Sequence, residues 1–138
     1  MIRFFVEGTP IAQPRPRARN AGAHARVYNP ATAREWKKAV RLQAKRFRPA
    51  QPILGPLTVH LAFYLPRPKR LMRKKDDAGP IKHPVKPDLD NLAKALLDSL
   101  TDDGGWWRDD AQIVGGMWEK FYAPVDAEPG VMIEVIED

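Results

Sequence analysis

The stretch KPDLDNLAKALLDSLTDDGGWWRDDAQI, residues 86–113, carries the clearest structural signal in the chain. A helix is predicted over about residues 88–100, because leucines recur there at helical spacing, at Leu89, Leu92, Leu96 and Leu100. The glycine pair in DDGG predicts a turn that ends this helix. The same stretch contains seven aspartates and no glutamate, although the chain has a formal net charge of +6. This acidic cluster therefore needs a structural or a functional explanation.

Alternating apolar residues predict strands on both sides of this helix. The predicted strands cover residues 2–6, 57–64, 112–122 and 131–136. An earlier helix is predicted from Asn29 and Pro30, an N-cap followed by proline in the first turn, to about Phe47. This order predicts an α+β fold, a single domain over residues 1–138 with a small mixed β-sheet packed against two main helices.

The composition excludes several classes of protein. With 138 residues and a hydrophobic fraction of 43%, the chain is long enough to bury one core and is not disordered as a whole. It contains no cysteine, which excludes a disulfide framework, a thiolate zinc site and a thiol nucleophile. No apolar run approaches the roughly eighteen residues of a membrane span, and MIRFFVEGTP is interrupted too early for a signal peptide. We therefore expect a cytoplasmic protein with no membrane association.

Positive charge is concentrated in the first part of the chain. Residues 1–86 hold 20 Lys and Arg against 4 Asp and Glu, whereas residues 87–138 hold 3 against 13. Two proline-rich basic loops are predicted, at about residues 9–30 and 66–87. Such a distribution favours a polyanionic partner, most often nucleic acid, although a solvated positive face is the alternative.

Asp88 and Asp90 stand at the predicted start of the acidic helix. Aspartate is a favoured N-cap, and carboxylates in the first turn complement the helix dipole, so capping alone can explain this pair. Capping does not require the second pair, Asp109 and Asp110, which a strand returning beside the helix would bring close. Three converging carboxylates would repel one another unless a divalent cation neutralised them, and oxygen-only ligands favour Mg²⁺ or Mn²⁺. In a basic protein, such a site suits the hydrolysis of a phosphodiester.

Lys94 lies four residues after Asp90 and therefore on the same face of the predicted helix. It is either one half of an ordinary ion pair or a cation that steadies the phosphate during cleavage. Asp98 shares that face, and we interpret it as a solvated residue. Asp102 and Asp103 precede two glycines and are interpreted as turn residues.

These motifs together resemble the signature of the RusA family of Holliday-junction resolvases. The matching residues are Lys86-Pro87-Asp88-Leu89-Asp90-Asn91-Leu92, then Lys94, Asp98 and Asp109-Asp110-Ala111-Gln112-Ile113. The resemblance implies a homodimeric, Mg²⁺-dependent endonuclease, with Mn²⁺ as a substitute, that cuts symmetrically paired strands at a four-way DNA junction. It implies that Asp88, Asp90 and Asp110 are catalytic and hold the metal, and that Lys94 is catalytic. Asp109 matches a neighbouring family aspartate, and because alternation along a strand would aim the two in opposite directions, we expect Asp110 to be the direct ligand.

The basic loops are interpreted as contacts to DNA phosphates, which would give steep salt dependence and little sequence information. The residues expected to bind DNA are Arg15, Arg17, Arg19, Lys69, Arg70, Arg73, Lys74 and Lys75. The alternative is that these loops are merely solvated. Trp106 and Trp107 would either stack at the opened crossover or pack in the core or a dimer interface, and packing is favoured for at least one of them. No role in metal binding or catalysis is assigned to His24, His60 or His83, which lack ligand spacing.

Two other functions compete with the nuclease hypothesis. One is a non-catalytic architectural protein that binds DNA junctions, in which the aspartates serve only as caps and turns. The other takes Asp88-Leu89-Asp90 as the nucleotide-sugar motif of a glycosyltransferase, but a three-residue motif is weak support and the chain is short for donor and acceptor domains.

Overall fold

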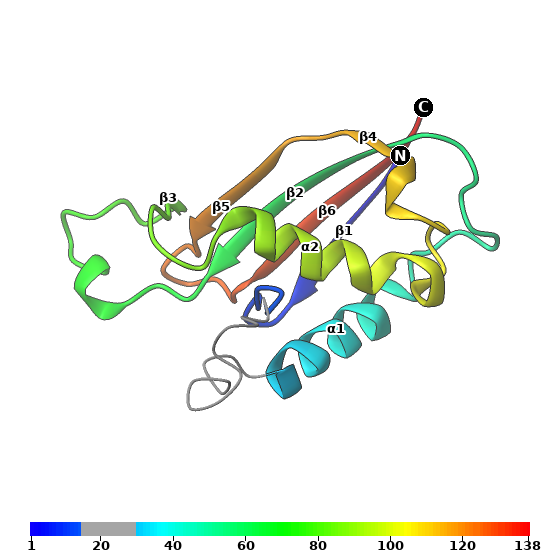
Figure 1. Ribbon diagram of the computed structural model, residues 1–138. Coiled ribbons are helices and arrows are strands. Elements are labelled where there is room, and N and C mark those ends of the chain that lie inside the picture. Colours follow the sequence, from blue (N-terminus) through cyan, green and yellow to red (C-terminus); the bar gives the residue numbers. More distant parts are fainter. Residues whose placement is uncertain (15–29) are drawn as a thin grey trace.

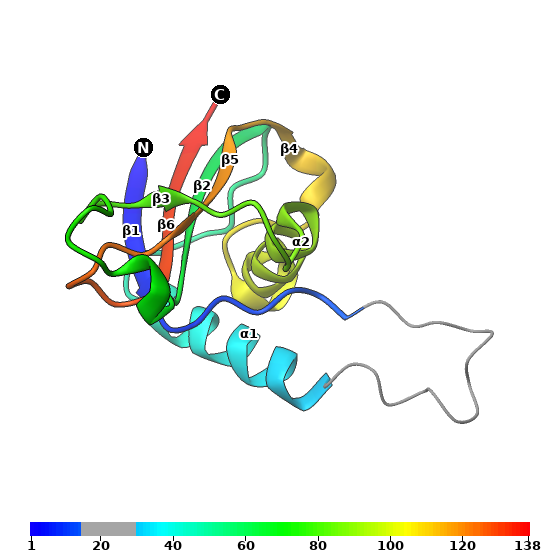
Figure 2. The ribbon, with the colours of Figure 1, turned by 90° about the vertical axis from the view of Figure 1, so that its left-hand side faces the viewer.

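A six-stranded mixed sheet forms one layer of the fold, and both α-helices cover the same face of it (Figures 1 and 2). The computed structural model describes residues 1–14 and 30–138. Its strands are β1 (Ile2–Glu7), β2 (Leu57–Leu65), β3 (Ile81–Lys82), β4 (Ile113–Gly115), β5 (Trp118–Tyr122) and β6 (Gly130–Glu137). Its helices are α1 (Pro30–Ala44), α2 (Leu89–Leu100) and the short 3-10 helices η3 (Lys69–Leu71), η4 (Asp102–Gly104) and η5 (Asp110–Gln112). The predicted α+β fold is confirmed.

The sheet has the strand order β1-β6-β2-β5-β3, and β4 pairs with the beginning of β2. β6 is antiparallel to both β1 and β2, whereas β4 and β5 run parallel to β2. β3 is antiparallel to β5 and forms a short edge of the sheet. Because β4 and β5 run parallel to β2, the chain after the acidic segment passes along β2. It then lies beside β3, which precedes the turn into α2.

The strand predicted over residues 112–122 is interrupted, so this part of the prediction is wrong. The break lies at Gly116, which has a φ of +151° and separates β4 from β5. A Cβ atom at this position would lie 1.9 Å from the carbonyl oxygen of Val59 in β2. The backbone therefore approaches β2 more closely than a side chain permits, and only glycine suits this backbone conformation.

The core lies between the sheet and the two helices. Every second residue of β2 from Leu57 to Leu65 is buried, as the alternating sequence predicts. Trp36 and Val40 of α1 and the leucines of α2 pack against this face. The helix predicted to reach Phe47 ends at Ala44, although the Phe47 ring still stacks on Phe4 with centroids 5.2 Å apart. The N-cap expected at Asn29 lies outside the described residues.

Trp106 and Trp107 are both fully buried. Trp106 stacks on Phe4 with ring centroids 5.0 Å apart, and the Trp107 indole N–H donates a hydrogen bond of 2.7 Å to Thr101. The packing interpretation is therefore confirmed for both tryptophans, and neither ring is available to stack at a DNA crossover. Asp102 and Asp103 lie in η4, within the turn after α2, as predicted.

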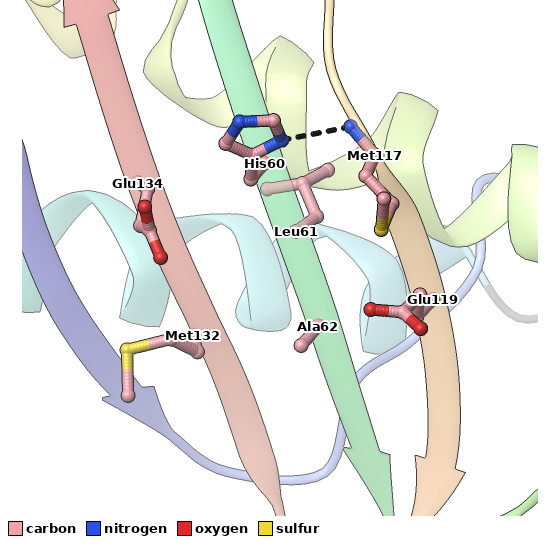
Figure 3. A pocket seen from close by; sticks show the side chains of 7 residues that line it. All are labelled: His60, Leu61, Ala62, Met117, Glu119, Met132 and Glu134. Atoms are coloured by element: carbon pink, nitrogen blue, oxygen red, sulfur yellow. Dashed lines mark hydrogen bonds between the residues drawn. The ribbon is translucent and has the colours of Figure 1, made fainter.

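Neither α1 nor α2 lies on the opposite face of the sheet (Figures 1 and 2). An aromatic row crosses it, with Tyr64 between Phe121, at 5.6 Å, and Phe5, at 6.4 Å. Beside this row lies a shallow depression of about 290 Å³, lined by His60, Leu61, Ala62, Met117, Glu119, Met132 and Glu134 (Figure 3). His60 accepts a hydrogen bond of 2.9 Å from the backbone N–H of Met117 and so joins β2 to the segment between β4 and β5. Among the described residues, no helix is long and apolar enough to cross a membrane.

Candidate active site

Asp88 and Asp90 stand at the beginning of α2, where both are exposed to solvent. Asp88 occupies the N-cap position with extended backbone angles (φ −70°, ψ 140°), but its carboxylate makes no capping hydrogen bond. Asp90 lies in the first turn, and its carboxylate accepts a hydrogen bond of 2.9 Å from the N–H of Asn91. Capping therefore does not account for the carboxylate of Asp88, which leaves it available for a ligand.

The second acidic pair lies on a short 3-10 helix and not on the strand that the sequence predicted. Asp109 is the N-cap of η5, and its carboxylate accepts a hydrogen bond of 2.9 Å from the N–H of Ala111. Asp110 instead lines a shallow cavity of about 420 Å³ beside α2, together with Leu97, Ile113, Val114, Gly115, Gly116 and Trp118. The two carboxylates thus have different environments, as expected, but the cause is the N-cap position and not strand alternation.

Gln112 fixes this acidic segment in place. Its side-chain carbonyl accepts hydrogen bonds from the N–H groups of Arg108 (3.0 Å) and Asp109 (3.1 Å). Its side-chain amide donates to the backbone carbonyls of Ile53 (2.8 Å) and Gly55 (3.0 Å). Gln112 therefore closes the capping box of η5 and ties η5 to the loop before β2.

The structure does not gather the three predicted metal ligands into one group. Within residues 1–14 and 30–138, no three His, Asp or Glu side chains lie close enough together to hold a metal ion. Asp110 shares its cavity with Leu97, which lies seven residues after Asp90 and hence ~10 Å further along the helix axis. The donor set still fits a hard cation, because all three are oxygen ligands and the carboxylates of Asp88 and Asp90 are exposed. Their roles as metal ligands stay predictions.

Lys94 and Asp98 take part in a chain of charges between the two helices. The Lys94 ammonium lies 3.9 Å from one carboxylate oxygen of Asp98, and the Lys37 ammonium of α1 lies 3.7 Å from the other. Asp98 is therefore not simply solvated, as the sequence suggested, because it bridges α1 and α2. The Lys94 side chain is 59% exposed and its contact is long, so this pair restrains it only weakly.

The described basic loop is folded around one buried arginine. Arg67 is only 8% exposed, and its guanidinium donates hydrogen bonds to the backbone carbonyls of Leu71 (2.9 Å), Gly79 (3.0 Å) and Asp77. The loop predicted over residues 66–87 accordingly contains the ordered elements η3 and β3. Sequence reasoning missed Arg67, because nothing in a run of basic residues distinguishes the one that folds inward.

Arg73, one of the predicted DNA contacts, is engaged within this loop. Its guanidinium forms two hydrogen bonds with the Asp76 carboxylate, at 3.1 and 3.2 Å. These bonds lower the pKa of Asp76 and raise that of Arg73. The other predicted contacts of this loop are exposed: Lys69, Arg70, Lys74 and Lys75.

The remaining predicted DNA contacts, Arg15, Arg17 and Arg19, lie outside the described residues. The described chain leads toward them from a point beside the candidate site. Ile11 and Ala12 pack against the core, and the N–H of Gln13 donates a hydrogen bond of 2.9 Å to the carbonyl of Asn91 in the first turn of α2. The first basic loop therefore leaves the core next to Asp90.

Comparison with known proteins identifies the family. A family model described as endodeoxyribonuclease RusA matches residues 7–136, nearly the whole chain. The chain thus falls within a class of DNA-cleaving enzymes and belongs to the RusA family. It is also 35% identical, over 143 residues, to the uncharacterized protein YqaN of Bacillus subtilis (strain 168), an alignment that covers 99% of this chain and 96% of YqaN. The resemblance noted from the acidic motifs is confirmed at the level of the family.

Proposed function

We propose that this protein is a Mg²⁺-dependent endonuclease that resolves four-way DNA junctions by paired symmetric nicks. The observation that carries the proposal is the pair of exposed carboxylates at the start of α2, of which Asp88 is not engaged in capping the helix. This pair lies inside the region that matches the endodeoxyribonuclease family. A solvent-exposed pair of hard oxygen ligands in a protein of net charge +6 suits a reaction on a polyanion.

In this proposal Asp88, Asp90 and Asp110 hold the cation. When bound, Mg²⁺ or Mn²⁺ would activate water and offset the charge on the phosphate. Because Asp110 lies beside Leu97, further along α2, the proposal requires Asp110 and the start of α2 to approach each other on binding. Lys94 is weakly restrained by Asp98, and we assign it to the developing negative charge of the scissile phosphate.

The basic loops hold the DNA in this proposal. Lys69, Arg70, Lys74 and Lys75 project from the loop that Arg67 orders, so phosphate contacts there require little further ordering of the chain. Arg15, Arg17 and Arg19 contribute further contacts from the segment that follows Gln13. Two such molecules in a symmetric homodimer would present two sites to opposed strands of a junction.

The test compares a four-way junction whose core can branch-migrate with a linear duplex of the same sequence. Each substrate is incubated with the parent protein and Asp90→Asn, in Mg²⁺ and in EDTA. We expect paired symmetric nicks in the junction alone, abolished by EDTA and by Asp90→Asn while junction binding persists. Asp126→Asn, which changes an exposed aspartate in the turn before β6, is the matched control and should cleave normally.

Several core sequences and Mn²⁺ are included, because a single junction can lack a suitable cleavage sequence. Tight junction binding without cleavage under all these conditions would contradict the proposal. It would instead support an architectural DNA-binding protein in which the aspartates are only caps and turns.

A further inference from the structure

Lys120 is the charged residue of β5 that faces the helix-covered side of the sheet. It pairs in register with Phe63, a fully buried residue of β2, so its side chain leaves the sheet on the same side as α2. Its ammonium group donates hydrogen bonds to the backbone carbonyls of Val85 and Pro87, the latter at 2.6 Å. Both carbonyls belong to the turn that delivers the chain from β3 into α2 (Figure 1).

A second contact ties the same turn to β5. The His83 ring packs on the Tyr122 ring with centroids 4.3 Å apart, and the backbone N–H of His83 donates to the carbonyl of Lys120 at 3.4 Å. Lys120 and Tyr122 lie on the same side of β5 because they are two residues apart. The turn from His83 to Pro87 is therefore held against β5 at both of its ends.

The position of the Lys120 ammonium is not explained by stability of the helix alone. A cation near the N-terminus of a helix opposes the helix dipole, which favours negative charge there. The Val85 end of the contact is exposed, so water can satisfy that carbonyl without the lysine. The hydrogen bonds of the Lys120 ammonium group instead fix the position of the backbone immediately before Asp88.

Lys120 also connects the two acidic segments of the candidate site. The chain runs from Asp110 through β4 into β5, and Gln112 anchors this segment to the loop before β2. From β5, Lys120 then holds the turn that ends at Asp88. Lys120 is therefore one of the side chains that link the strand following Asp110 to the turn preceding Asp88.

We propose that Lys120 is a positioning residue, whose ammonium group holds the carbonyls of Val85 and Pro87 and so fixes the carboxylates of Asp88 and Asp90 for metal binding. The role of these carboxylates in cleavage rests on the function proposed above. The position of the turn itself does not, and it can be measured without metal or DNA.

The first measurement is hydrogen–deuterium exchange of the metal-free protein over residues 84–95. Lys120→Met keeps the aliphatic chain and removes the donors, and we expect exchange there to become about tenfold faster. Lys120→Arg keeps a cationic donor and should restore most of the protection. Lys82→Met, at an exposed lysine of the adjacent strand β3, is the matched control and should exchange like the parent.

The second measurement is the Mg²⁺ concentration that gives half-maximal junction cleavage. Lys120→Met should raise this midpoint about tenfold while junction affinity in EDTA changes less than about twofold. If Lys120→Met showed the same hydrogen–deuterium exchange and the same Mg²⁺ midpoint as Lys82→Met, the proposal would be overturned. Unchanged exchange with weaker junction binding would also overturn it, because Lys120 would then be a phosphate contact. If the parent does not cleave, the proposed nuclease function fails, and the exchange result still decides whether Lys120 positions the turn.

Discussion

Asp109 and Asp110 are adjacent in the chain but differ in what their carboxylates contact. Asp109 accepts a hydrogen bond from the N–H of Ala111 and caps η5, whereas Asp110 faces the cavity beside Leu97. One aspartate of the pair is therefore engaged in local structure, and the other is available to a ligand.

This difference predicts opposite effects of two substitutions. Asp109→Ala removes the cap and should lower the free energy of unfolding by about 1 kcal/mol, while Asp109→Asn, which can still cap, should change it little. Asp110→Asn should leave stability unchanged and reduce junction cleavage by at least about 100-fold. Urea denaturation and single-turnover cleavage of the same preparations separate the two effects. Loss of cleavage in Asp109→Asn with normal cleavage in Asp110→Asn would reverse our assignment.

Arg67 is expected to stabilise the folded conformation of the basic loop over residues 66–87. Arg67→Met leaves several backbone carbonyls without their charged donor and should destabilise the protein by about 2–4 kcal/mol. Limited trypsin digestion should then cut faster between residues 69 and 75. Arg70→Met changes an exposed arginine of the same loop and should stay within about 0.5 kcal/mol of the parent. A digestion rate of Arg67→Met between residues 69 and 75 equal to that of the parent would show that Arg67 does not order this loop.

The basic side chains of this loop should not contribute equally to DNA binding. Arg73 is bonded to Asp76, whereas Lys74 and Lys75 are exposed without such a partner among the described residues. The slope of log affinity against log salt concentration should fall by about 1 for Lys74→Gln or Lys75→Gln. It should change less for Arg73→Gln, and junction titrations at four salt concentrations measure this. A slope change for Arg73→Gln as large as that of the lysine variants would refute the distinction.

His83 should make stability depend on pH. Burial, and secondarily the charge of Lys120, lowers the pKa of His83 in the folded protein. Because the unfolded chain then binds a proton more readily, this contribution is complete above about pH 6.5 and is lost as the pH falls below it. Urea midpoints should therefore decrease between pH 7.5 and pH 5, and less so in His83→Phe, which keeps the ring against Tyr122. Identical pH profiles for the two proteins would contradict this assignment.

Among the exposed glycines that the structure describes, Gly116 should be the least replaceable. Gly116→Ala would place Cβ against the Val59 carbonyl and should cost about 2–4 kcal/mol. Gly55→Ala is the matched control, because a Cβ there meets nothing within 4 Å. Its free energy of unfolding should lie within about 0.5 kcal/mol of the parent. Thermal unfolding of both variants provides the comparison.

The periodic spacing of apolar residues in the sequence predicted most of the helices and strands. The leucines of α2 and the alternation in β2 predicted those elements almost to the residue, because each is amphipathic along its whole length. The break at Gly116 was not predictable, since its cause is a close approach to Val59, a residue far away in the sequence. The same holds for the order of the strands in the sheet.

The candidate site was predictable in its residue types but not in its arrangement. Spacing alone identified Asp88 and Asp90 at a helix start. It did not indicate that Asp110 would lie beside Leu97, or that Asp98 would bridge two helices. The roles of Lys120 and Arg67 could not be predicted from the sequence. Each donates hydrogen bonds to backbone carbonyls of a segment whose path is known only in the folded chain.

The tryptophans of this chain differ in exposure, so quenching of its intrinsic fluorescence can be assigned to one of them. Trp36, Trp106 and Trp107 are buried, whereas Trp118 is 36% exposed and lines the same cavity as Asp110. Collisional quenchers such as acrylamide will therefore act mainly on the emission of Trp118. The native protein thus carries an optical reporter beside one of its acidic residues, and binding events there can be followed without attaching a dye.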